Sequence, residues 1–543
     1  MILDVFISVL VFLQKGLLSI GPFILLLGVL IFIHELGHFL AARYCGVKVE
    51  VFSLGFGPKL FEYRKGETLF AVSLFPLGGY VKMFGDDPSK KIPASEQHRG
   101  FLYKKVSQKL MIAFGGPFMN LLFTLFAFFL LGILGTPALE PQLGDVSKDT
   151  KAYSFGFRSG DTILSIDGHK VSYWEDVKRF IQDHPNQEMV FEVSKGDQNK
   201  QLYKVKSNLE KSKNIFSTRK EEGAVQGLTP FSRSTQVGVV YNSPAYQAGL
   251  RTFDQIQYIE REKVRYWRNV GKVFKSFSSP VVLTVKRAEQ DLQIKLPEVA
   301  SLKQIGIEDS SLYVSKVGEG TPADQVGLKQ GDRLVSLNNQ KLKDWKQVWN
   351  FIRTSSGKEF SLKFSRQGKL QTVRITPKAM YVEGQLKENF MIGVVSGETQ
   401  VLPNKLVKKE TVLGSFAYSG IQTWHWLSMM TIGLYRLAQG KLSMRTLGGP
   451  IVIGRMAHNS FKTGFISFLF MMALISLNLF FLNLLPIPML DGGHILFFTL
   501  EGIIGRPIDV KKLIVAQQLG FFVLMFFFAF TFLNDIYNWL NAW

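Results

Sequence analysis

The stretch from Ile24 to Ala42, ILLLGVLIFIHELGHFLAA, places two histidines and a glutamate inside an otherwise apolar run. Residues four apart lie on one face of a helix, so His34 and His38 can share a metal ion while Glu35 stands beside it. Zinc hydrolases use this spacing to hold Zn²⁺ and to activate a water molecule. An ionisable residue costs about 3 kcal/mol to insert at the centre of a membrane span, which favours a metal site over a buried histidine with a helix-end salt bridge.

The composition indicates a polytopic membrane protein with several domains. At 543 residues the chain is too long for one hydrophobic core, and its 46% hydrophobic share, with 47 phenylalanines, is concentrated in a few segments. The net charge of +21 is scattered, so anionic lipid head groups are the expected counterpart and nucleic acid is not. Cys45 is the only cysteine, which excludes a disulfide within one chain. The apolar N-terminus continues into the metal motif without a cleavage site, which argues against a signal peptide.

Four segments are long and apolar enough to cross about 30 Å of hydrocarbon. They are residues 20–42, 110–135, 465–490 and 513–533. A fifth candidate runs from Phe416 to Ala438 and would also be permitted by its hydropathy. We expect it to lie in the membrane interface instead. A second crossing between the HELGH span and Asp491, the candidate third metal ligand, would put Asp491 on the wrong side of the membrane.

Basic residues in the short loops indicate the orientation. They gather after the first span, before the second, and between the last two, and positively charged loops face the cytoplasm. The N-terminus, the 137–412 region and the C-terminus are then expected outside. The residues concerned are Arg43, Lys48, Lys59, Arg64, Lys65, Lys82, Lys104, Lys105, Lys109, Arg506, Lys511 and Lys512.

The 137–412 region contains an internal repeat. DTILSIDGHKVSYW begins at Asp161, DQIQYIEREKVRYW at Asp254 and DRLVSLNNQKLKDW at Asp332. A tryptophan follows each aspartate at the same distance, which predicts three copies of one small unit of short strands with a helix after the tryptophan. The pattern resembles bacterial PDZ domains, which bind extended peptides or C-termini at a sheet edge. Spacers or steric filters are the alternative. The second copy departs most, since Phe253 replaces a glycine and Arg261-Glu262 replaces an Asp-Gly turn.

The stretch 47–84 reads as strands on the cytoplasmic side. FEYR and TLFAVSLF flank Lys65-Gly66-Glu67, a hairpin signal, and a further run covers Gly79 to Met83. A small sheet beside an intramembrane metal can offer an edge strand to an unfolded substrate segment, although an ordinary folded loop would look the same.

Zinc needs a third protein ligand, and the candidate lies far downstream in NLFFLNLLPIPMLDGGH, residues 478–494. Asp491 ends an apolar run and follows Pro486 and Pro488, which cannot both sit within an ordinary helix. The backbone is therefore expected to unwind where the aspartate is presented, and such backbone survives at membrane depth only inside protein or beside a cavity. A helix cap is the alternative role for this aspartate.

HELGH in the first span, NLLPIPMLDGGH in a late span and PDZ-like units between them resemble the site-2 protease family of intramembrane zinc metalloproteases, in particular the regulator-of-sigma-E protease group. GFGPKL after the first span and FGGPFMN at the second extend the likeness. The resemblance implies His34, His38 and Asp491 as zinc ligands and Glu35 as general base. It also implies contacts of Asn483, Asn478 and Pro486 with bound peptide, with interhelical hydrogen bonding as the alternative for the asparagines. Familiar bacterial members carry two PDZ domains, whereas this chain reads as three.

The predicted fold is a polytopic α-helical membrane protein with four transmembrane helices, a small cytoplasmic membrane-associated β-sheet and three PDZ-like α+β domains. The predicted function is hydrolysis of peptide bonds in transmembrane segments of single-pass proteins, such as anti-sigma factors or remnant signal peptides, at the bacterial inner membrane. A catalytically idle PDZ scaffold is the rival, and Glu35 argues against it. The expected divisions are 1–46, 47–109, 110–136, three PDZ-like units at 137–225, 226–300 and 301–400, interface helices at 401–461, and spans at 462–495 and 513–534.

Overall fold

The computed structural model describes the chain except residues 1, 88–91, 145, 147, 196–198, 213–220, 232–234, 265–266, 278–279, 289, 299–300, 319, 381–388, 398–404, 410, 443, 445–446, 507 and 542–543. For residues 2–20, 76–77, 268, 380, 389, 405, 510 and 538–541 it describes the backbone alone. The chain forms two compact units. Residues 1–136 and 408–537 make the first, and residues 137–407 with 538–543 make the second.

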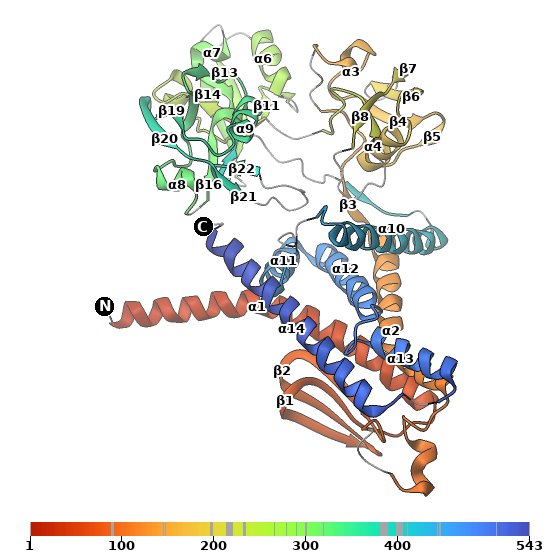
Figure 1. Ribbon diagram of the computed structural model, residues 1–543. Helices are drawn as coiled ribbons and strands as arrows, with labels where there is room; N and C mark the ends of the chain where they lie inside the picture. Colours follow the sequence, from red (N-terminus) through yellow and green to blue (C-terminus); the bar gives the residue numbers. More distant parts are fainter. Residues whose placement is uncertain are drawn as a thin grey trace. The chain divides into compact units, whose positions relative to one another are not determined.

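The first unit is helical apart from one hairpin (Figure 1). Within the described chain, four helical stretches are long and apolar enough to span a membrane, as predicted: Gly21–Tyr44, Val106–Leu134, Phe465–Asn483 and Lys511–Tyr537. The predicted interface helix is not among them. The helices of this unit are α1 (Ile2–Tyr44), α2 (Val106–Leu134), α10 (Val412–Ala438), α11 (Pro450–Thr463), α12 (Phe465–Asn483), α13 (Asp491–Ile504) and α14 (Val510–Asn541), with a short 3₁₀ turn η1 (Ala94–Arg99).

The third predicted span, 462–495, is two helices rather than one. Helix α12 ends at Asn483, and α13 begins at Asp491. Pro486 and Pro488 lie in the gap, where their missing N–H groups and fixed rings prevent a continuous helix. Met489, also in the gap, has a φ of +87°. The aspartate therefore opens a new helix instead of ending the span.

The hairpin of strands β1 (Val49–Lys65) and β2 (Thr68–Met83) folds back on itself into four short runs. Residues 49–54 pair on one side with 69–72 and on the other with 79–83, while 59–65 pairs with 68–73. The run 79–83 thus lies at an edge of this small sheet and packs beside α1. This arrangement matches the strands expected in the 47–84 segment.

Three sheets of the second unit share one strand order, in which a central strand pairs with a short strand on one side and a long hairpin on the other. Each has its own hydrophobic core and a helix that starts at the predicted tryptophan. The elements are β4 (Thr162–Ile166), β5 (His169–Lys170), α4 (Trp174–Asp183), β6 (Glu188–Lys195) and β7 (Asn199–Lys206) in module 1; β11 (Gln255–Ile259), β12 (Glu262–Lys263), α6 (Trp267–Ser276), β13 (Val281–Arg287) and β14 (Gln290–Leu296) in module 2; β17 (Arg333–Leu337), β18 (Gln340–Lys341), α9 (Trp345–Thr354), β19 (Phe360–Arg366) and β20 (Lys369–Ile375) in module 3.

Shorter elements complete this unit. They are β3 (Thr136–Ala138), α3 (Lys151–Ser154), β8 (Asn208–Lys211), β9 (Glu221–Ala224), β10 (Val237–Val239), α5 (Pro244–Gln247), α7 (Leu302–Ile305), β15 (Ile307–Asp309), η2 (Ser310–Leu312), β16 (Val314–Val317), α8 (Pro322–Gln325), β21 (Lys378–Met380), β22 (Asn389–Met391), β23 (Val394–Ser396) and β24 (Lys405–Val407). The expected boundary at residue 300 is wrong, because Ile305 and Ile307 pack in the core of module 2 and β15 pairs with β10.

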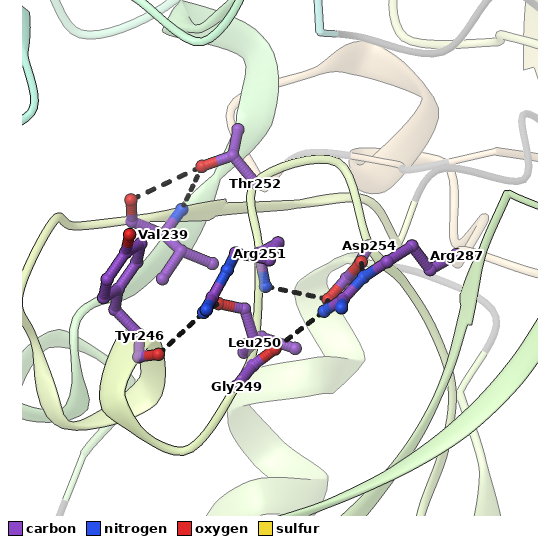
Figure 2. A network of polar contacts seen from close by, with 8 residues as sticks. All are labelled: Val239, Tyr246, Gly249, Leu250, Arg251, Thr252, Asp254 and Arg287. Carbon is purple, nitrogen blue, oxygen red and sulfur yellow. Dashed lines mark hydrogen bonds and ion pairs between the residues drawn. The ribbon is translucent and has the colours of Figure 1, made fainter.

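A buried aspartate fastens the loop before the central strand of module 2. Asp254 accepts hydrogen bonds from the Arg251 backbone N–H and from two nitrogens of Arg287, which also reaches the Gly249 carbonyl (Figure 2). Arg366 makes the same paired contact with Asp332 in module 3. Phe253 adopts a φ of +76°, close to the values of the glycines it replaces, Gly160 and Gly331. The departure in sequence therefore keeps the backbone conformation of the repeat.

Candidate metal centre

Three side chains from two distant parts of the chain meet at one point. His34 Nε2 lies 3.2 Å from one carboxylate oxygen of Asp491, and His38 Nε2 lies 3.3 Å from the other. One ligand atom from each residue falls within 4.8 Å of the others, and the three side chains are 12–18% exposed. Two imidazole nitrogens and a carboxylate are a donor set that suits Zn²⁺ with an open fourth position. The residues that the sequence predicts as metal ligands are thus brought together.

Glycines on both helices, Gly37 of α1 with Gly115 and Gly116 of α2, allow α1 and α2 to pack closely beside these ligands. A Cβ placed on Gly37 would lie 2.1 Å from the Gly115 carbonyl oxygen, so neither helix backbone could approach the other if side chains stood there. A Cβ on Gly116 would lie 2.3 Å from His38 Nε2 and 2.7 Å from His34 Cε1. The helix crossing therefore lies directly against the two imidazoles.

The outer nitrogens of both histidines are held by α2. His38 Nδ1 lies 2.8 Å from the Ile112 carbonyl oxygen, which can only accept, so this nitrogen carries the hydrogen and Nε2 keeps its lone pair for a metal. His34 Nδ1 lies 3.1 Å from Asn120 Nδ2. Both rings are consequently fixed with Nε2 towards Asp491.

Glu35 borders a cavity of about 270 Å³ beside these residues. The cavity also reaches Asp491, His494 and the edge run of β2, so it links the carboxylate of Glu35 to the metal ligands and to this edge run. Its lining consists of Glu35, His38, Val81, Met83, Asp86, Phe101, Ile112, Ala113, Asp491, His494 and Phe498. The candidate base, two of the candidate metal ligands and the edge run of β2 therefore border one cavity.

The predicted peptide contacts are not gathered in this way. Asn478 and Asn483 are half-buried on α12, Pro486 is exposed in the break after it, and none of the three lines the cavity. Their roles stay predictions. His494 lines the cavity and stacks on Phe498, with ring centroids 6.1 Å apart, but it is not part of the three-residue group.

Sequence reasoning missed the functional side of α2. Gly116 and Asn120 both lie in FGGPFMN, where the run of two glycines before a proline is the available signal. Lys109, 4% exposed and paired with Glu501, carried no signal beyond its charge near a span.

Residues 22–527 of the chain match peptidase family M50. The chain belongs to this family. It is 30% identical over 521 residues to a protein named as a zinc metalloprotease, PM1991, of Pasteurella multocida, covering 95% of this chain and 98% of that one. It is 29% identical over 520 residues to the regulator of sigma E protease of Haemophilus influenzae and 27% identical over 526 residues to that of Escherichia coli, with the same coverage. The M50 peptidase is therefore a multi-pass zinc metalloprotease of the intramembrane, site-2 type.

Among solved structures, a PDZ domain of an SdrC-like protein from Listeria monocytogenes aligns with 16% of this M50 peptidase and 90% of its own chain, at 20% identity and a TM-score of 0.15. An HtrA-type protease, AlgW, bound to a decapeptide aligns with 35% of the peptidase and 74% of its own chain, at 12% identity and a TM-score of 0.12.

Proposed function

We propose that this M50 peptidase hydrolyses peptide bonds within or near the transmembrane segment of single-pass membrane proteins, with His34, His38 and Asp491 as zinc ligands and Glu35 as general base. The observation that carries the proposal is the convergence of these donors on one point beside two apolar helices, with Glu35 on the adjoining cavity. When bound, zinc lowers the pKa of a water molecule to about 7 and polarises a carbonyl oxygen.

The chain's own groups then divide the work. The two histidines and Asp491 orient the site, while the Glu35 carboxylate takes the proton of the attacking water and delivers it to the leaving amine. Hydrogen bonds from α2 keep the imidazoles aimed, and the surrounding apolar side chains limit the access of bulk water to the reaction.

The substrate helix must unwind first, because its carbonyls are engaged in its own hydrogen bonds. The edge run 79–83 supports this step, since Val81 and Met83 line the cavity and β-pairing can hold an extended segment there. Asn478, Asn483 and Pro486 are proposed to contact the bound segment as it emerges. Single-pass substrates with weak helices would be preferred.

The three modules of residues 137–407 are proposed to be PDZ-like and to lie outside the cytoplasmic membrane. The shared strand order and helix positions support one repeated unit, and the short-loop charges support the orientation. The relatives named regulator of sigma E protease suggest anti-sigma factors as a substrate class. The modules would capture C-termini or exclude substrates with large folded ectodomains.

The test is cleavage of a candidate single-pass substrate by purified protein in lipid vesicles, with and without a zinc chelator. Wild-type protein should cut, the chelator should stop it, and zinc should restore it. A Glu35→Gln variant should hold zinc and fail to cut. Near-normal turnover by that variant would exclude Glu35 as the general base. Absence of cleavage by the zinc-loaded wild type would favour the scaffold alternative.

A further inference from the structure

Asn120 is a fully buried residue of α2 that directs its amide at the metal site from outside. Its relative exposure is 0%, and its Nδ2 lies 3.1 Å from His34 Nδ1. Its Oδ1 is buried and has no hydrogen-bond partner among the described residues. A buried amide oxygen without a hydrogen bond destabilises an apolar interior, so its presence calls for an explanation.

The chemistry of His34 supplies one. His34 Nε2 faces Asp491 and His38 Nε2, which leaves Nδ1 on the side of Asn120. A neutral imidazole that gives its Nε2 lone pair to a metal carries its hydrogen on Nδ1, and this N–H needs an acceptor. The amide nitrogen of Asn120 cannot accept, whereas its unpartnered oxygen can after a half-turn of the terminal torsion.

We propose that Asn120 is a positioning residue for the metal site, and that its Oδ1 accepts the hydrogen of His34 Nδ1 when the metal is bound. This inference rests on the proposed zinc site. His38 already has an acceptor of this kind in the Ile112 carbonyl oxygen, so α2 would hold both histidines in the same tautomer. The backbone carbonyl cannot be changed by substitution, but the asparagine can.

The position of Asn120 is itself well anchored. Its own carbonyl oxygen accepts hydrogen bonds from Thr124 Oγ1 and from Ser476 Oγ of α12, both at 2.9 Å. These two hydrogen bonds hold the backbone of Asn120 in place, and its buried side-chain amide can still rotate about its terminal bond. Thr423 of α10 provides a matched control, because it is also buried and its hydroxyl donates to the Ser419 carbonyl oxygen rather than to Asn120 or a histidine.

The experiment measures zinc affinity of purified full-length protein by competition with a chromogenic chelator. Asn120→Leu should weaken zinc binding about 10–100-fold, as loss of an outer-shell partner does. Asn120→Asp, which keeps an acceptor oxygen, should bind zinc at least as tightly as wild type. Thr423→Val should lower the unfolding temperature and leave zinc affinity unchanged.

A second readout separates orientation from packing. With ¹⁵N-labelled histidine, the zinc-loaded wild type and Asn120→Asp should each show a slowly exchanging His34 Nδ1–H signal, and Asn120→Leu should not. Wild-type zinc affinity in Asn120→Leu, or equal losses in the Leu and Asp variants, would overturn the proposal. Failure of the wild type to bind zinc would instead reject the metal site on which the proposed function depends.

Discussion

Lys109 Nζ lies 2.6 Å from Glu501 Oε1, an ion pair that joins α2 to the far end of the helix that Asp491 opens. Lys109 is 4% exposed and also lies over the ring of Phe498, 5.2 Å from its centroid. Because α13 presents the third predicted ligand at its first residue, this pair helps to set where that carboxylate stands against the histidines of α1.

Removing one partner of the pair should therefore affect both stability and metal binding. Lys109→Met leaves the Glu501 carboxylate, which is 17% exposed, without its cationic partner. Removing one partner of a buried ion pair typically destabilises a protein by about 3–5 kcal/mol. We expect a lower unfolding temperature and weaker zinc retention. The exchanged pair Lys109→Glu with Glu501→Lys should recover part of both. Equal zinc affinity in Lys109→Met and wild type would show that the pair acts on stability alone.

Asp491 and Glu35 should separate in their effects on the metal. Purified protein should hold about one zinc per chain, measured by atomic emission after dialysis. Asp491→Ala should lose most of it, because two histidines alone complete only half of a tetrahedral site. Glu35→Gln should keep it. Full zinc occupancy in Asp491→Ala would remove this residue from the ligand set.

The orientation can be tested by cysteine labelling on a Cys45→Ser background, since Cys45 is 7% exposed and the only native thiol. Cysteine in place of the exposed Ser95 should be protected from an impermeant thiol reagent in intact cells. Cysteine in place of the exposed Lys358 should be labelled once the reagent has crossed any outer membrane. The reverse pattern would invert the protein and reopen α10 as a span.

The buried aspartates of the modules make a prediction about stability and pH. Lys195 ends its strand in module 1 where modules 2 and 3 have Arg287 and Arg366, and burial raises the pKa of Asp161. A folded pKa above the unfolded value means that Asp161 contributes more stability as pH falls through it. Lys195→Arg can supply a paired contact, which should stabilise module 1 near neutral pH and reduce this pH dependence.

The reverse change supplies the control. Arg366→Lys breaks the paired contact with Asp332, which is 2% exposed, and should destabilise module 3 by about 1–2 kcal/mol. The local stability of modules 1 and 3 is measured in the whole protein by hydrogen exchange, followed in peptides from 161–195 for Lys195→Arg and from 332–366 for Arg366→Lys. Faster exchange in module 1 of Lys195→Arg than in wild type would contradict the predicted stabilisation by arginine.

Removal of the three modules should change which substrates are cleaved more than the rate of peptide-bond hydrolysis. All the proposed zinc ligands and the general base lie outside 137–407. The comparison uses a single-pass substrate with its ectodomain intact and one with it trimmed. Full-length enzyme should prefer the trimmed form, and replacement of 140–400 by a flexible linker should narrow the preference. A folded, zinc-bound deletion that cuts neither substrate would mean that the modules help to build or open the site.

The sequence predicted what depends on local pattern. Spans, the strands after the first span and the helices that begin at Trp174, Trp267 and Trp345 all follow from periodicity and repeats. Pro486 and Pro488 predicted the break, although the aspartate was assigned to the end of a span rather than to the start of α13.

Features that depend on how helices cross could not be read in this way. Nothing in the period of α2 indicates that Gly116 and Asn120 are the residues facing α1, since any face of an apolar helix can meet lipid or protein. The boundary at 300 failed for a similar reason. Ile307 completes module 2 by pairing with Val239, and no local signal marks a strand that pairs with one far back in the chain.

Gly79 connects recognition to chemistry in a way that bears on how selective such an enzyme can be. A Cβ there would lie 2.8 Å from Glu35 Cγ and 2.9 Å from the Ser53 carbonyl oxygen, so the edge run and the glutamate share one wall. A substrate segment that stays helical cannot pair with this strand. If it displaced the strand, it would also displace Glu35. The enzyme would then select substrates by backbone conformation rather than by side chains. A segment that remains helical would not be cleaved even when it lies beside the metal.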